Sequence, residues 1–194
     1  MFEEHGVIRN AVSMTPAPAL DAGTAQQQRW EYYGRTPAGT RYAPFQQITP
    51  ENVNKLEVAW AFRTGDIAGK GAEDQSTPTQ IGDTLYICTP YAKIIALEAE
   101  TGKEKWRFDS QSADSKLWNR CRGVAHYDAA AYSASHPGDA PAKTAATSAT
   151  CARRVFIGTP DARLIAVDAA NGQPCAGFGQ NGVVDLKVGM GLVQ

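Results

Sequence analysis

Three polar side chains stand beside turn-forming residues and could bind a small ligand. Arg122 is followed by Gly123, Gln75 lies three residues before a proline, and Arg63 precedes a Thr-Gly turn. A guanidinium group presents a planar fork of N–H donors that can meet a carboxylate through two hydrogen bonds, and a glutamine amide both donates and accepts. Alternatives stay open: Arg122 and Gln75 bind a ligand or are solvated loop residues, and Arg63 faces a ligand or pairs with Asp66.

The cysteines and histidines do not have the spacing of a metal site. The four cysteines include no C-x-x-C pair, and the histidines stand singly, so we expect no zinc-type site and interpret as loop residues His5, His126 and His136. Cys121 and Cys151 bracket a long Ala-rich segment. In an oxidising compartment a bridge between them would close that loop and reduce its entropy. Two buried free thiols are the alternative.

Composition excludes several classes of protein. The 194 residues are 43% apolar and 20% charged, which is typical of a globular protein with a sizeable core. The net charge is -1, and no block of like charge could follow a nucleic-acid backbone. The chain has no apolar stretch long enough to span a membrane, and residues 1–9 lack the apolar segment of a signal peptide. The Gly-rich segment 65–71 does not have the spacing of a phosphate loop.

An internal repeat predicts the elements that must position these side chains. Residues 82–106 align without a gap with residues 152–176, and eight of the 25 aligned positions are identical. Each copy has a β-rich apolar run, a short turn, a second run and a Gly turn, which is typical of short antiparallel strands. The expected strands are Leu85–Thr89, Ile94–Leu97 and Lys105–Phe108 in the first copy, and Val155–Thr159 and Leu164–Asp168 in the second.

Repeated units of this kind stack as a solenoid or as the blades of a β-propeller. The succession of strand, turn, strand, Gly turn and Trp favours an all-β partial propeller over residues 29–194; a β-sandwich with a chance similarity is the alternative. The repeat offset exceeds the roughly 40 to 50 residues of a four-stranded blade, which predicts an Ala-rich insertion at about 110–150. Within it, residues 128–150 show neither strand alternation nor a capped helix and are expected to be flexible. Residues 1–28 are interpreted as a flexible lead or linker.

Residues 96–106 resemble the tryptophan-docking motif A-x-D-x-x-x-G-x-x-x-W of quinoprotein dehydrogenases, with Glu98 in place of the Asp. The resemblance implies that Trp106 lies flat between neighbouring blades. The second copy has Ala176 in place of the Trp, and Cys175 and Phe178 are expected to fill the same wedge.

Segments 30–45, 48–65 and 120–124 are similar to the membrane-bound glucose, quinate and shikimate dehydrogenase branch. The resemblance implies an eight-bladed propeller that binds pyrroloquinoline quinone (PQQ) and calcium, of which this chain supplies about two to three blades. Arg122 matches the family arginine that hydrogen-bonds the cofactor. Gln75 stands where methanol and glucose dehydrogenases carry a cofactor-contacting Glu, which favours quinate or shikimate over glucose; Arg63 is a further cofactor-binding candidate.

The same resemblance implies the oxidation of an alcohol, a polyol, a sugar or a cyclic hydroxy acid, with electrons passed to ubiquinone by a protein of the periplasm that associates with the inner membrane. The family's catalytic Asp lies beyond the part that resembles residues 152–194, so we expect no catalytic residue here and an inactive chain, either a cloned fragment or a truncated gene product. The alternative is a cofactor-free propeller scaffold for outer-membrane assembly. The Cys-Arg-Gly-Val and Phe-Arg-Thr-Gly loops argue against it.

Overall fold

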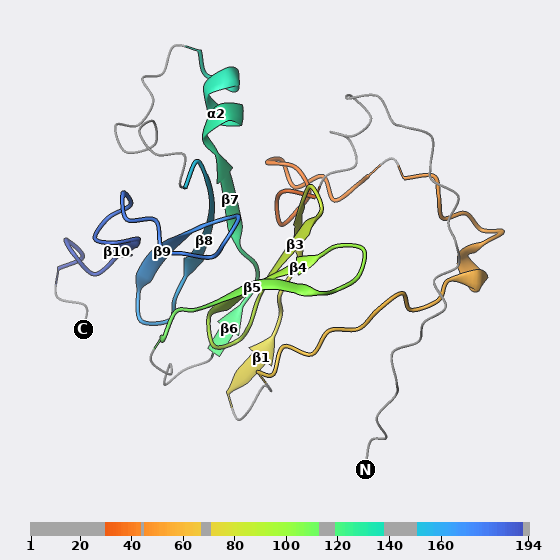
Figure 1. Ribbon diagram of the computed structural model, residues 1–194, viewed down its shortest axis with the longest axis horizontal. Helices are drawn as coiled ribbons and strands as arrows, with labels where there is room; N and C mark the ends of the chain where they lie inside the picture. Colours follow the sequence, from red (N-terminus) through yellow and green to blue (C-terminus); the bar gives the residue numbers. More distant parts are fainter. Residues whose placement is uncertain (1–29, 44, 67–70, 113–118, 138–150, 192–194) are drawn as a thin grey trace.

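The computed structural model describes residues 30–43, 45–66, 71–112, 119–137 and 151–191, and two four-stranded antiparallel sheets dominate it (Figure 1). The first sheet has the order β2-β3-β4-β5, and we call it the first blade; the second has the order β10-β9-β8-β7, and we call it the second blade. The first blade consists of β2 (Thr79–Ile81), β3 (Thr84–Cys88), β4 (Lys93–Glu98) and β5 (Glu104–Asp109). The second consists of β7 (Ala125–Asp128), β8 (Arg153–Gly158), β9 (Arg163–Asp168) and β10 (Val183–Asp185).

The described residues also form smaller elements outside the two four-stranded sheets. They are the 3-10 turn η1 (Val53–Lys55), the strands β1 (Ala72–Asp74) and β6 (Asn119–Cys121), which pair in parallel, and the helix α2 (Ala129–Ser135). No helix in the described part of the chain is long and apolar enough to cross a membrane.

The repeat positions occupy equivalent places in the two blades, which confirms the predicted strands to within about two residues. Ile87 pairs with Ile95 across β3 and β4, as Ile157 pairs with Ile165 across β8 and β9. Because alternate side chains of a strand point to opposite faces, each blade turns one apolar face toward the other blade. These faces pack together in one buried core, formed by Tyr86, Cys88, Ala92, Ile94, Ala96, Cys121, Val155, Ile157, Ile165, Val167 and Ala169.

Trp106 fastens the first blade to the second, as the docking motif implied. Its indole Nε1 donates a hydrogen bond to the carbonyl of Ala169, at 3.2 Å. The ring lies so close to Gly172 that a Cβ built there would stand 2.5 Å from the ring carbon Cε3. Gly172 has a φ of +73°, a left-handed conformation that also favours glycine. The Trp106 ring therefore packs on the turn between β9 and β10.

Trp60 repeats this contact one blade earlier. Its Nε1 donates to the carbonyl of Ala99, at 3.1 Å, and a Cβ on Gly102 would stand 2.4 Å from its ring. Since Trp106 belongs to the outermost strand of its blade, the extended segment around Trp60 lies against the first blade as the outer strand of a preceding blade would. The chain therefore contains two consecutive inter-blade docks.

A carboxylate forms a second kind of inter-blade contact at the opposite end of the strands, which we call the carboxylate clasp. Asp66 precedes the first blade in the chain and reaches its β3–β4 turn, accepting hydrogen bonds from Thr89 Oγ1 at 2.6 Å and Lys93 Nζ at 2.7 Å. Burial alone would raise the pKa of Asp66, but the bonds from Lys93 and Thr89 outweigh it and hold the pKa below its ordinary value.

The second blade has an equivalent clasp, but its carboxylate belongs to the turn between β8 and β9 instead of to a preceding segment. Thr159 and Arg163 stand where Thr89 and Lys93 stand in the first blade, and both bond to Asp161 of the same turn. Ser112, which follows β5 of the first blade, reaches across and donates to Asp161 at 3.1 Å. Burial opposes ionisation here too, but the bonds from Arg163 and Thr159 lower the pKa of Asp161 to about 2.

The disulfide prediction was wrong. Cys88 pairs with Cys121 and Cys151 with Cys175, so neither the expected Cys121–Cys151 bridge nor the alternative of two free thiols is present. The reason is the strand order: β6 pairs with β1, which brings Cys121 to the end of β3, whereas Cys151 lies beside β9, where the backbone N–H of Cys175 bonds to Ala166. With about 33 and 24 residues between partners, each bridge removes about 3.5 kcal/mol of chain entropy from the unfolded state in the loop-closure model.

The Ala-rich region contains a helix that the sequence analysis did not expect. Asp128 accepts hydrogen bonds from the backbone N–H groups of Ala130 and Ala131 and so caps α2. His126 lies in β7, paired with Val155, and was wrongly expected in a loop. His136 follows α2 as its C-cap. The predictions for residues 1–28, for His5 and for residues 138–150 fall outside the described residues.

Candidate functional site

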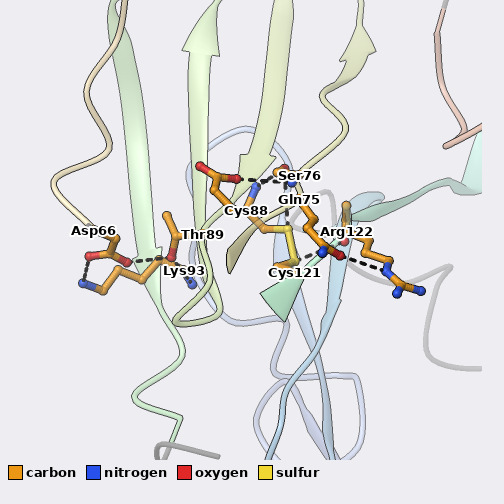
Figure 2. Close-up of a disulfide and its surroundings, with 10 residues drawn as sticks. Asp66, Gln75, Ser76, Cys88, Thr89, Lys93, Cys121 and Arg122 are labelled. Atoms are coloured by element: carbon orange, nitrogen blue, oxygen red, sulfur yellow. Dashed lines mark hydrogen bonds and ion pairs between the residues drawn. A yellow bond between two sulfur atoms is a disulfide. The ribbon is translucent and has the colours of Figure 1, made fainter. Parts of the chain in front are cut away.

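Two of the three predicted site residues lie side by side. The parallel pairing of β1 with β6 sets Glu73 opposite Arg120 and Asp74 opposite Cys121, and the next residues continue the register. Arg122 Nε donates to Gln75 Oε1 at 3.3 Å (Figure 2). The backbone carbonyl of Arg122 then accepts from the N–H of Thr77, at 2.9 Å. A cross-strand register between remote segments therefore assembles the pair.

The Gln75–Arg122 pair lies where both blades begin. Gln75 stands four residues before β2, and Arg122 stands three residues before β7, so each precedes the first strand of its blade. The clasp residues Asp66, Thr89 and Lys93 lie at the same end (Figure 2), and the tryptophan docks lie at the other. This end of the propeller fragment therefore carries the candidate site.

Glu73 fixes the orientation of the Gln75 amide. Gln75 Nε2 donates to Glu73 Oε2 at 2.6 Å, and Arg120 forms an ion pair with the same carboxylate at 3.2 Å. With its NH₂ group turned toward Glu73, Gln75 offers its carbonyl oxygen to Arg122. Arg122 thus has a neutral partner, whereas the positive charge of Arg120 is paired with the carboxylate of Glu73.

A cavity of about 500 Å³ lies beside Arg122. Its lining is otherwise aromatic, aliphatic or glycine: Tyr33, Gly123, Val124, Ala125, Phe156, Gly158 and Leu164. The Arg122 side chain is exposed, and within the described residues its only hydrogen-bonded side-chain partner is Gln75, through Nε. Its two Nη groups can therefore meet a ligand. Arg122 is the one charged residue among the described residues of this lining and can bind an anionic group.

Arg63 does not join this site. Its side chain is exposed, and the structure places no hydrogen bond or ion pair between Arg63 and Gln75 or Arg122 in the described ranges. Nor does it pair with Asp66, because Lys93 and Thr89 occupy that carboxylate. A cofactor contact of Arg63 stays a prediction.

Sequence reasoning missed two residues that shape the site, Glu73 and Ser76. Glu73 stands two residues before Gln75, on the same side of an extended segment. Ser76 Oγ accepts a hydrogen bond from the backbone N–H of Cys88 at 3.1 Å. The period of two along the strand could have pointed to Glu73, but nothing local indicated the contact of Ser76. Among the described residues, no group of three or more His, Cys, Asp or Glu side chains could hold a metal ion.

Consecutive four-stranded meanders fastened by tryptophans define a β-propeller. Residues 30–194 match the PQQ family model described as "Glucose/ethanol/alcohol dehydrogenase, beta-propeller domain". The chain therefore belongs to the PQQ-dependent dehydrogenase family, and its relatives include the quinate/shikimate and glucose dehydrogenases.

Relatives match nearly the whole chain. The chain is 39% identical over 196 residues to quinate/shikimate dehydrogenase (quinone) of Acinetobacter baylyi, covering 98% of this chain and 24% of the relative. It is 46% identical over 173 residues to a protein named "Probable quinate dehydrogenase (quinone)" of Xanthomonas campestris pv. juglandis, covering 85% and 22%. It is 35% identical over 195 residues to quinoprotein glucose dehydrogenase of Escherichia coli, covering 97% and 23%. The chain thus spans about a quarter of the length of these relatives.

Solved structures support the fold. Quinohemoprotein alcohol dehydrogenase from Comamonas testosteroni superposes with a TM-score of 0.59 at 24% identity, over 87% of this chain and 21% of that one. Quinohemoprotein alcohol dehydrogenase ADHIIG from Pseudomonas putida HK5 gives a TM-score of 0.58 at 27% identity, over 85% and 20%. The prediction of a partial β-propeller from this family is confirmed.

Proposed function

We propose that the whole protein is a PQQ-dependent dehydrogenase that oxidises a cyclic hydroxy acid such as quinate or shikimate, and that this chain supplies part of its cofactor-binding face. Oxidation of glucose is the second candidate, because glucose dehydrogenases are also among the relatives. The observation that carries the proposal is the Gln75–Arg122 pair at the end where both blades begin.

The residues present fit the cofactor. PQQ is a flat tricarboxylate with adjacent quinone carbonyls, and a guanidinium fork binds carboxylate or paired carbonyl oxygens through two hydrogen bonds. The contact with Gln75 uses only Nε of Arg122, so the fork of its Nη groups is available on the side of the cavity.

Each residue of this site has a role that its contacts support. When bound, PQQ accepts the electrons that the alcohol loses. Arg122 binds and orients the anionic cofactor, Gln75 holds the Arg122 side chain, and Glu73 fixes the amide of Gln75. We assign the catalytic base and the calcium ligands to parts of the whole protein outside this chain.

The neutral amide at position 75 favours an acidic substrate. A carboxylate there would pair with Arg122 and cancel its charge, whereas Gln75 leaves that charge in place. A site with Gln75 is therefore less negative than one with a glutamate there, even when Arg122 binds the anionic cofactor, and it should repel a hydroxy acid less. The relative with 46% identity is named as a probable quinate dehydrogenase, which agrees with this choice.

We further propose a periplasmic location, association with the inner membrane and ubiquinone as electron acceptor. Two disulfides among four cysteines fit an oxidising compartment. Two relatives carry "(quinone)" in their names, which supports a quinone as the acceptor.

The test is PQQ binding by the whole protein and by its Arg122→Ala and Arg122→Lys variants. Loss of a charge-assisted, two-point contact is expected to raise the PQQ Kd about 10- to 100-fold in Arg122→Ala, with a smaller rise in Arg122→Lys, which keeps the charge without the fork. Arg153→Ala is the matched control, because Arg153 is exposed at the opposite end of the second blade. Equal Kd values for Arg122→Ala and wild type would refute the proposed site. Activity with quinate and with glucose then separates the two candidate substrates.

A further inference from the structure

Cys88 contacts both halves of the Gln75–Arg122 pair through their neighbours (Figure 2). Its sulfur is bonded to Cys121, which directly precedes Arg122. Its backbone N–H donates to Ser76 Oγ at 3.1 Å, and Ser76 directly follows Gln75. One residue at the end of β3 therefore holds the two backbone segments that present the site.

The site needs such an anchor because its other contacts are hydrogen bonds and an ion pair of exposed or half-buried residues. Gln75 and Arg122 are exposed, so no core packing determines their positions. The strands β1 and β6 that lead to them are three residues long and form an isolated parallel pair, and so small a sheet is marginal by itself. Cys88 and Cys121, by contrast, are 1% and 8% exposed and belong to the core shared by the two blades.

We propose that the Cys88–Cys121 disulfide, together with the Ser76 hydroxyl, is a positioning device for the cofactor-binding pair, and that it sets the affinity for PQQ. This inference rests on the proposed function. The disulfide transmits the rigidity of the core to Arg122, so the guanidinium is already in place when the cofactor arrives. A preorganised contact loses less free energy to ordering on binding than a mobile one.

The second disulfide provides a matched control. Cys151 and Cys175 close a loop of similar length, with a sequence separation of 24 against 33. They pack with Ala166 and Phe156, and Cys151 precedes the end of β8 that is remote from Arg122. Loss of either disulfide should therefore lower the stability to a similar extent, but only loss of Cys88–Cys121 should change the position of the Gln75–Arg122 pair.

The experiment compares the whole protein with its Cys88→Ser/Cys121→Ser and Cys151→Ser/Cys175→Ser double variants. PQQ affinity and Tm are measured for each. We expect both double variants to lose Tm, and only Cys88→Ser/Cys121→Ser to raise the PQQ Kd, by about tenfold. An equal rise in Kd in both double variants, or no rise in either, would overturn the inference, because affinity would then follow stability or neither bridge would matter.

Two further measurements apply if the first double variant does not fold. In the Cys151→Ser/Cys175→Ser background, dithiothreitol can reduce only Cys88–Cys121 among these cysteines: it supplies two electrons and two protons, giving two thiols and its own cyclic disulfide. It is removed before PQQ is added, because it would reduce the quinone as well. The Kd should rise and return on reoxidation. Ser76→Ala should raise the Kd, and Ser76→Thr, which keeps the hydroxyl, should restore it. Unchanged Kd values in these measurements would refute the inference.

The two proposals fail in different ways. A wild-type protein that binds no PQQ would contradict the proposed function. A wild-type protein that binds PQQ, with unchanged affinity when Cys88–Cys121 is removed, would contradict the positioning role alone.

Discussion

Replacing Gly172 by alanine tests the claim that Trp106 fastens the two blades. The new Cβ would stand 2.5 Å from the indole carbon Cε3, and the residue would keep a φ of +73°. The left-handed conformation costs an alanine about 1–2 kcal/mol, and forcing a methyl group into a packed contact costs about 1–3 kcal/mol more. The expected loss in the free energy of unfolding is therefore about 2–5 kcal/mol.

Gly82→Ala separates these two costs. Gly82 has a φ of +60° and nothing within 4 Å of its built Cβ, so its substitution should cost only the conformational share of about 1–2 kcal/mol. In a chain of this size each kcal/mol lowers Tm by about 2–4 °C. Gly172→Ala should therefore melt about 5 °C below Gly82→Ala.

A double-mutant cycle identifies the partner of the new methyl group. With Trp106→Ala in place the clash is absent, so Gly172→Ala should then cost about as much as Gly82→Ala. Urea unfolding followed by circular dichroism gives the four free energies. Equal costs for the two glycine substitutions, or a cost of Gly172→Ala that does not depend on Trp106, would refute the docking argument.

The remaining predictions concern charge. Asp161 has a lowered pKa of about 2, so its contribution to stability is fully present above about pH 4 and is lost as the pH falls toward 2. Asp161→Asn should therefore lower the free energy of unfolding at pH 7 by about 1–2 kcal/mol. The Tm values of the variant and the wild type should converge near pH 2. A Tm difference that stays constant over a pH series would contradict this. Gln75→Glu should pair with Arg122, raise the PQQ Kd several-fold and shift kcat/KM from quinate toward glucose, whereas the control Gln80→Glu in β2 should do neither. Unchanged substrate preference in Gln75→Glu would contradict the charge argument.

The sequence predicted the blades well because their pattern is local. Each copy of the repeat has two short apolar runs bounded by turn residues, and Gly102 and Gly172 mark the turns on which a Trp packs. The docking of Trp106 follows from that local pattern. The repeat alone could not predict the clasps, because their carboxylates occupy non-equivalent positions. Asp66 precedes the first blade, whereas Asp161 lies within the second.

Contacts between remote segments were harder to predict. Four cysteines allow three pairings, and the correct one depends on the parallel register of β1 with β6. That register also brings Gln75 to Arg122, a contact across 47 positions that no local pattern encodes. The cap of α2 at Asp128, by contrast, was visible as an Asp followed by three alanines and was overlooked.

The tryptophan docks and the carboxylate clasps, which lie at opposite ends of the inter-blade contact, respond differently to added salt. The tryptophan end is held by an aromatic ring on a glycine turn, which added salt strengthens or leaves unchanged. The clasp end is held by ion pairs such as Lys93–Asp66, which added salt screens. Added salt therefore weakens the inter-blade contacts of the clasp end more than those of the tryptophan end. Because Arg122 lies at the clasp end as well, added salt should weaken the inter-blade contacts on the same side of the propeller as the candidate cofactor site.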